Sequence, residues 1–335
     1  MWMNECDTHS DVVLSSRVRL ARNVKDVVFP ALMDNAQKER MCDAVRDALA
    51  GSAYSLIRMS DLSKLDQMML VERHLISPDL VCNPYGAVLC SKDEQAAVMV
   101  NEEDHLRIQA FAPSLHLKDA EQKASEIHRE LEKKLGFAFD DTLGFLTACP
   151  TNTGTGMRVS VMLHLPALTI SRNIQSIVHA TGQFGLTMRG IYGEGTAAQG
   201  CIYQLSNQIT LGLMEEEIVS NIENAARRLI EQERKVRADL FANRVIMEDR
   251  AYRAYGTMLY ARRISIEEFM KLFSDVKLGV SAGVIKGVNQ AALHTLLVEL
   301  QPAGIQKCMG DAKNMDIDEI RAQLLREKLK DKEVK

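Results

Sequence analysis

The sequence has 335 residues, of which 46% are hydrophobic and 26% are charged, and its formal net charge is −4. This composition is typical of a globular protein and excludes a largely disordered chain. The small negative charge gives no reason to expect nucleic acid or a membrane surface as the main partner. No apolar run reaches the roughly 18 residues of a transmembrane helix. Seven cysteines form no CxxC pair, so neither a disulfide framework nor a zinc site is predicted. We therefore expect a reduced, cytoplasmic protein.

The predicted elements change in character along the chain. The first part alternates helices with short strands and glycine-rich turns; helices are predicted over 36–49 and 117–135, and strands over 97–100, 144–148, 159–163 and 200–205. Gly136 is expected to end the second helix as a C-cap. After Met214 only helices are predicted, over 213–241, 244–263, 265–274, 289–300 and 317–332. We expect an α+β domain at 1–238 followed by a small all-helical domain at 239–335.

The first motif that can carry chemistry is Ser15-Ser16-Arg17-Val18-Arg19. Two arginines at i and i+2 of an extended segment point to the same face, so both can reach one anion. By itself the pattern is weak, and an exposed edge strand with two solvated arginines is the more common explanation.

The second motif is Asn101-Glu102-Glu103-Asp104-His105-Leu106-Arg107, which directly follows an apolar strand-like run. Three consecutive acids with a histidine and an arginine are unusual at the end of a buried strand. A polar cluster at that position favours either a catalytic site or an ordinary loop.

The third motif runs from Cys149 to Arg158 with the sequence CPTNTGTGMR. Small hydroxyl residues and two glycines allow backbone N–H groups to converge on an oxyanion, and Arg158 adds a positive charge where the loop ends. Neither a Walker A loop nor a GxGxxG fingerprint is present. Cys149 is either an active-site thiol or a small buried side chain.

The fourth motif is the glycine-rich segment RGIYGEGT from Arg189 to Thr196, which contains Glu194. A loop of this kind can close over a substrate and deliver a carboxylate. A simple glycine-rich hairpin is the alternative.

Together and in this order, the four motifs resemble those of the phosphagen (guanidino) kinases, over roughly residues 11–238. The resemblance implies an antiparallel sheet flanked by helices. It also implies transfer of a phosphoryl group from ATP to a guanidine, with Mg²⁺ held by phosphate oxygens and water rather than by protein ligands. This chemistry needs a positive site for the triphosphate and carboxylates that hold the guanidinium and accept its proton.

The resemblance assigns Glu103 as the favoured base and Glu194 as the second carboxylate on the guanidinium. His74 occupies the position of a nucleotide-contacting histidine, although a structural histidine is the alternative. The implied ATP contacts are Ser15, Ser16, Arg17, Val18, Arg19, His74, Arg107, Arg158, Val159, Ser160, Val161, Met162, Arg189, Gly190, Ile191, Tyr192 and Gly193.

Within that family the chain resembles the bacterial protein-arginine kinases. Because SSRVR begins at residue 15, we expect the helical domain that precedes this motif in creatine and arginine kinases to be absent. The C-terminal helical domain of the subfamily is associated with dimerisation and with a phosphoarginine pocket marked RDxxRA. Here Asp318, Arg321 and Ala322 match, but Ile317 replaces the leading arginine, which puts the pocket in doubt.

The resemblance therefore predicts an ATP-dependent protein-arginine kinase that works in stress response and protein quality control, as a homodimer. Its implied partners are arginine-bearing protein substrates, a zinc-finger activator protein, a heat-shock repressor and an AAA+ protease unfoldase. A kinase for free arginine or another small guanidine is an alternative. A non-catalytic phosphoarginine-binding adaptor is an alternative of another class.

Overall fold

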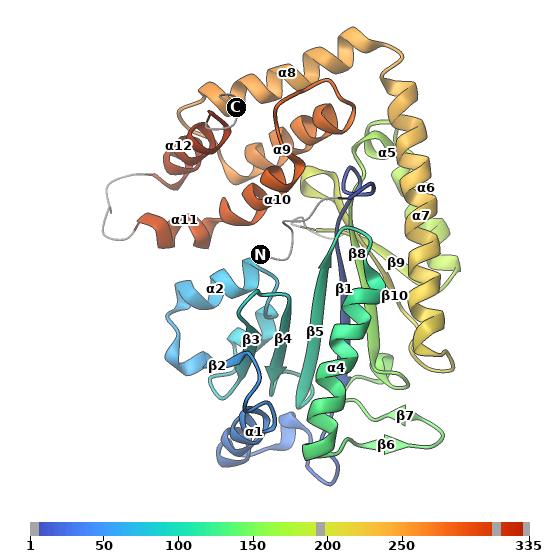
Figure 1. The fold of residues 1–335 in the computed structure, drawn as a ribbon, viewed down its shortest axis with the longest axis vertical. Coiled ribbons are helices and arrows are strands. Elements are labelled where there is room, and N and C mark those ends of the chain that lie inside the picture. Colours follow the sequence, from blue (N-terminus) through green and yellow to red (C-terminus); the bar gives the residue numbers. More distant parts are fainter. Residues whose placement is uncertain (1–6, 192–197, 310–315, 331–335) are drawn as a thin grey trace.

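The computed structural model describes residues 7–191, 198–309 and 316–330. Its central feature is an eight-stranded antiparallel sheet in the order β2-β3-β4-β5-β1-β8-β10-β9, and β6 and β7 form a separate hairpin (Figure 1). The strands are β1 (Val13–Arg22), β2 (Tyr54–Arg58), β3 (Ala87–Ser91), β4 (Ala96–Val100), β5 (Leu106–Pro113), β6 (Phe139–Asp140), β7 (Gly144–Phe145), β8 (Met157–His164), β9 (Leu186–Gly190) and β10 (Ile202–Asn207).

Helices lie between the strands and follow them in the chain. They are α1 (Asn35–Ala48), α2 (Lys64–Glu72), α3 (Pro78–Val81), α4 (Leu117–Leu135), α5 (Pro166–Ile170), α6 (Ile174–Gln183), α7 (Glu215–Leu240), α8 (Arg244–Tyr260), α9 (Ile266–Ser281), α10 (Gln290–Glu299), α11 (Pro302–Met309) and α12 (Ile317–Lys330). None of the helices in the described ranges is both apolar and long enough to cross a membrane.

Alternation along β1 separates a core face from a polar face. Val18 and Leu20 lie in the hydrophobic core that the long helices α4 and α7 cover, whereas Arg17 and Arg19 alternate with them and point to the other face. Both helices bury apolar side chains every three or four residues, so each presents one apolar stripe to the sheet. The strand pattern therefore leaves the opposite face free for polar side chains.

The C-terminal helices pack at the end of the sheet where β1 begins (Figure 1). A second hydrophobic cluster joins Leu14, Met162 and Ile202 of the sheet to Phe269 and Phe273 of α9. The helical part is thus attached to the sheet through a shared apolar core. The sheet with its helices and the helical C-terminal region confirm the expected α+β class.

Some elements of the structure differ from the predictions. The strand predicted over 144–148 is only two residues long, because the Ala148 N–H donates to the side chain of Asp104 and leaves the strand ladder. Helix α11 was not predicted. Its first N–H groups, on Ala303 and Gly304, donate to the carboxylate of Glu72, a partner 231 residues away in the chain. The predicted domain boundary near 238 lies in the last turn of α7 and stays a prediction.

Candidate active site

Arginines from four strands point away from the face that α4 covers. Arg19 of β1 pairs with Arg158 of β8 in the strand register, and Arg17 lies two residues before Arg19. Arg107 is the second residue of β5, and Arg189 lies in β9. Each alternates with a buried apolar neighbour, so strand geometry directs all five side chains to the same side of the sheet.

These five guanidinium groups form one chain of electrostatic neighbours. Burial and the charges of Arg17, Arg107 and Arg158 lower the pKa of Arg19, while burial and the charges of Arg107 and Arg189 lower the pKa of Arg158. The Nε atom of Arg19 is buried without a hydrogen-bond partner among the described residues. Like charges held this close destabilise one another, so the arrangement suits a polyanion that neutralises them.

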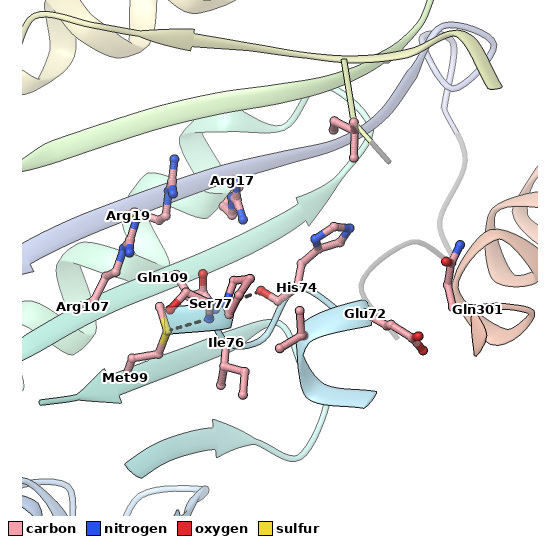
Figure 2. A pocket seen from close by; sticks show the side chains of 13 residues that line it. Arg17, Arg19, Glu72, His74, Ile76, Ser77, Met99, Arg107, Gln109 and Gln301 are labelled. Carbon is pink, nitrogen blue, oxygen red and sulfur yellow. Dashed lines mark hydrogen bonds between the residues drawn. The ribbon is translucent and has the colours of Figure 1, made fainter. Parts of the chain in front are cut away.

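Four of the arginines, Arg17, Arg19, Arg107 and Arg189, border two adjoining cavities of about 400 and 330 Å³ that share Arg17, His74 and Ile191, whereas Arg158 lines neither cavity. Figure 2 shows the labelled arginines at one end of the first cavity, Glu72 and Gln301 at the other end, and His74 between them. The site is therefore elongated, with its positive charge concentrated at one end.

Neighbouring side chains hold two of the arginines in place. Arg17 donates through Nη2 to Gln204 Oε1 at 2.8 Å and through Nε to Ser160 Oγ at 3.4 Å. Arg107 donates to both carboxylate oxygens of Glu102, at 2.8 and 2.7 Å. The Glu102 side chain is only 4% exposed, so this bidentate pair fixes Arg107 at the edge of the cavity.

The acidic segment places its three carboxylates in different environments. Glu102 pairs with Arg107, Asp104 is buried, and Glu103 is exposed. Desolvation and the negative charges of Asp104 and Glu102 raise the pKa of Glu103, while the charge of Arg107 and the neighbouring Cys149 thiol act in the opposite direction. A carboxylate with a raised pKa is a better proton acceptor, and here it lies beside the thiol.

Asp104 joins the two loops that carry Glu103 and Cys149. Its Oδ1 accepts hydrogen bonds from Asn23 Nδ2 at 2.6 Å and from the Ala148 N–H at 2.7 Å. Asn23 in turn accepts the His105 N–H at 2.8 Å. The candidate base Glu103 directly precedes Asp104, and the candidate thiol Cys149 directly follows Ala148. The hydrogen-bond network therefore sets the relative position of the base and the thiol.

His74 lies just after α2 with a φ of 61° and borders both cavities. Burial and the nearby Arg17 lower its pKa to about 3, so the imidazole is neutral near pH 7. Its backbone oxygen accepts a hydrogen bond from Gln109 Nε2 at 3.1 Å. The structure thus places a neutral ring, held by a left-handed turn, beside the arginines.

The predicted ATP contacts divide between the two faces of the sheet. Besides the residues above, those that line the second cavity are Ser15, Ser160, Met162, Gly190 and Ile191. The side chains of Val18, Val159 and Val161 instead lie in the core under the helices, and Ser16 Oγ donates to Ser114 O. Their side chains do not face the cavities, because successive strand residues face opposite ways, and their ATP contacts stay a prediction. Tyr192, Gly193 and Glu194 lie outside the described residues.

The three residues predicted for a phosphoarginine pocket are on α12. Arg321 is 1% exposed and donates to Leu300 O at 3.1 Å, to Ile264 O at 2.8 Å and to Asp318 Oδ1 at 2.6 Å. Ala322 is fully buried. Arg321 therefore ties together segments of the helical region, and its guanidinium is already surrounded by protein acceptors.

Glu102, Gln204 and Asn23 support the site but were not singled out from the sequence. The run of three acids indicated Glu102 without separating it from Glu103. Gln204 and Asn23 reach their partners only through the sheet, and Gln204 is 187 residues from Arg17. No local pattern in the sequence indicates such pairs.

Comparisons with known proteins place both parts of the chain in known families. The family model described as the ATP:guanido phosphotransferase C-terminal catalytic domain matches residues 36–236, and the model described as the protein-arginine kinase McsB C-terminal domain matches residues 244–335. The chain is 48% identical over 338 residues to a protein-arginine kinase of Symbiobacterium thermophilum, covering 98% of this chain and 96% of the relative. It is 43% identical over 336 residues to that of Bacillus subtilis, covering 98% of this chain and 93% of the relative.

Solved structures share the fold over about two thirds of the chain. The duplicated taurocyamine kinase of Schistosoma mansoni superposes with a TM-score of 0.60 at 30% identity, over 68% of this chain and 33% of that protein. Lombricine kinase superposes with a TM-score of 0.61 at 24% identity, over 71% of this chain and 70% of that protein, and at this identity it supports the fold alone. The family matches and the nearly full-length relatives show that this chain belongs to the protein-arginine kinases, within the ATP:guanido phosphotransferase family.

Proposed function

We propose that this chain transfers the γ-phosphoryl group of ATP to the guanidino group of arginine side chains in proteins. The observation that carries the proposal is the cluster of five arginines from four strands: four of them line one pair of cavities, and the fifth, Arg158, interacts electrostatically with Glu103 and Cys149. The relatives named protein-arginine kinase support the choice of acceptor.

In this proposal Arg17, Arg19, Arg107, Arg158 and Arg189 bind the triphosphate. Their mutual repulsion is relieved when the phosphates enter, so part of the binding free energy comes from the arrangement of the unliganded site. The apolar remainder of the first cavity takes the nucleoside, with His74 at the junction.

Glu103 is the proposed base. A guanidinium has a pKa above about 12 and is a poor nucleophile while protonated. Glu103 accepts one N–H proton while that nitrogen's electron pair forms the bond to the γ-phosphorus, and the bond from that phosphorus to the bridging oxygen breaks to release ADP. The raised pKa of Glu103 favours this proton transfer. Glu194, outside the described residues, is proposed from the family resemblance to hold the other side of the guanidinium.

Mg²⁺ is proposed to enter with the nucleotide. Among the described residues, no three His, Cys, Asp or Glu side chains are grouped so as to hold a metal ion, and the nearby Glu102 is already engaged by Arg107. Phosphate oxygens and water are therefore its proposed ligands, where the ion would neutralise part of the triphosphate charge.

The wider biological setting is a proposal that rests on the family resemblance. We infer a cytoplasmic homodimer that acts in stress response and protein quality control. Its proposed partners are a zinc-finger activator protein, a heat-shock repressor and an AAA+ protease unfoldase. The absence of a membrane-spanning helix from the described residues is compatible with this setting.

The deciding experiment offers MgATP with either an unfolded arginine-containing protein or free L-arginine. Products are read by mass spectrometry under non-acidic conditions, because phosphoramidates are labile in acid. We expect phosphoarginine on the protein, and loss of the label with Glu103→Gln. Labelling of free arginine alone would support the small-guanidine alternative, and equal labelling by wild type and Glu103→Gln would contradict the assigned base.

A further inference from the structure

A groove of about 550 Å³ lies behind the loop that carries Cys149. It runs between the β6–β7 hairpin and the segment 210–216, and Gly154 and Thr155 form part of its lining. Its rim presents four large apolar side chains, each between 47% and 66% exposed: Phe139, Leu143, Leu211 and Met214. Several exposed apolar side chains around one concave surface indicate an interaction site rather than scattered surface residues.

The groove is held rigidly to the catalytic loop. Thr210 Oγ1 donates to Thr151 O at 3.0 Å and to Thr153 O at 2.7 Å. A Cβ atom on Gly154, whose φ is +113°, would lie 2.4 Å from Thr210 O, so only glycine allows this close approach. On the hairpin side, the Phe145 ring stacks over the Arg22 guanidinium at 3.6 Å from the ring centroid. A ligand in the groove would therefore be fixed relative to the thiol loop.

The charge of the groove is opposite to that of the phosphate site. Asp141 and Glu216 line it, and neither forms an ion pair with any described residue, whereas the adjacent Glu215 lies 3.5 Å from Arg22. The groove thus combines apolar contacts with uncompensated negative charge. Complementary ligands carry apolar and basic side chains together.

We propose that this groove binds an extended segment of the substrate polypeptide that flanks the target arginine. The proposal rests on the proposed function and adds a docking surface to it. Phe145 and Cys149 are four residues apart, so at most about 14 Å separates their Cα atoms. An extended chain covers that distance in about four to five residues, so a substrate can occupy the groove while a nearby arginine reaches Glu103.

This chemistry selects unfolded segments over folded proteins. Folded proteins bury most of their large apolar side chains, so a segment that offers apolar and basic groups together in extended form is available mainly when the substrate is unfolded. The groove would therefore favour arginines near normally buried residues, while an isolated surface arginine would gain nothing from it.

The test compares two substrates for each variant. One is a peptide with a single arginine and apolar residues about four to six positions away; the other is N-acetyl-arginine amide, which is too small to reach the groove. Leu211→Ser/Met214→Ser removes apolar contacts, and Asp141→Lys/Glu216→Lys reverses the charge. Leu32→Ser is the matched control, because Leu32 is 78% exposed and outside the groove lining.

We expect each double variant to raise KM for the peptide roughly tenfold, which corresponds to about 1.4 kcal/mol of binding. The activity on the small compound, KM for ATP and the melting temperature should remain those of wild type, as should every property of Leu32→Ser. If both double variants fold and their KM for the peptide is unchanged, the groove is not the docking site, and the proposed function is unaffected. A wild-type enzyme that labels the small compound but no polypeptide would overturn the proposed function itself.

Discussion

The buried carboxylate of Asp104 accepts the Ala148 N–H at 2.7 Å, and this bond connects the loop of Glu103 to the loop of Cys149. Asn23 strengthens the connection by donating to the same oxygen at 2.6 Å and to Leu146 O at 3.0 Å. The candidate base and thiol thus depend on a carboxylate that does not line either cavity.

Asp104→Ala should lower kcat by about tenfold or more while KM for ATP changes little. Loss of the shared acceptor releases the two loops, and misplacement of a catalytic group by about 1 Å can cost up to a hundredfold in rate. Steady-state kinetics with MgATP and an unfolded protein substrate provide the measurement. Asn23→Ala should shift kcat in the same direction.

Two further variants separate positioning from general destabilisation. Asp104→Asn keeps an acceptor oxygen for Ala148 and should retain more of kcat than Asp104→Ala. Asp93→Ala is the control, because Asp93 also accepts a loop N–H, that of Gln95 at 3.0 Å, away from the cavities. A similar kcat for Asp104→Ala and Asp93→Ala would contradict the positioning role.

The pH–rate profile should report Glu103. As a base it acts when ionised, and desolvation with the charges of Asp104 and Glu102 raises its pKa above the ordinary 4.5. The rate should therefore fall as the pH drops through a midpoint above 4.5. In Asp104→Asn one of the negative neighbours is gone, so the pKa of Glu103 falls and the acidic limb should move to lower pH.

Glu103→Gln provides the second half of this test. It should reduce kcat by at least about a hundredfold, the scale of removing a general base, and abolish the acidic limb. Circular dichroism would confirm folding. An acidic limb that persists unchanged in the glutamine variant would show that another group controls it.

Arg19→Met should make the unliganded protein more stable and the enzyme less active. The half-buried side chain of Arg19, with its Nε atom enclosed, lies among three other arginines, and replacement of buried charged groups by apolar ones of similar volume stabilises by roughly 1–4 kcal/mol in known cases. Its positive charge is also expected to bind phosphate. The melting temperature without nucleotide should therefore rise, while the increase caused by MgATP should shrink.

The matched comparison is Arg40→Met, because Arg40 is exposed on α1 and lines neither cavity. Both melting temperatures of that variant should stay close to wild type. An Arg19→Met protein that keeps the full nucleotide-induced stabilisation would remove Arg19 from the proposed phosphate site.

Arg321→Ala should mainly destabilise the helical region. Its side chain donates to Leu300 O and Ile264 O, and each acceptor left unsatisfied in a buried place costs about 1–3 kcal/mol. Denaturant unfolding should show a loss of this size, whereas Arg326→Ala in the same helix should lose less, because within the described ranges Arg326 bonds only to Ala261 O. Equal stability of wild type and Arg321→Ala would instead support an open, ligand-binding guanidinium.

Local rules predicted much of the fold. The end of α4 at Gly136, with its φ of 63°, and the shared face of Arg17 and Arg19 on β1 follow from backbone preference and strand alternation. The extent of the strand predicted over 144–148 and the existence of α11 did not follow, because Asp104 and Glu72 supply hydrogen bonds there from distant parts of the chain.

By itself, the sequence determined which residue types are available and on which face of a strand each lies, since alternation is a local property of the backbone. It thereby indicated the arginines, Glu103 and Cys149. Only the tertiary structure decided which of these residues meet, because strand pairing brings Arg19 opposite Arg158. It also decided the role of Arg321, whose buried side chain donates a hydrogen bond to Ile264 O. These outcomes depend on contacts between residues far apart in the chain, whose desolvation and charge interactions exist only once the sheet has formed.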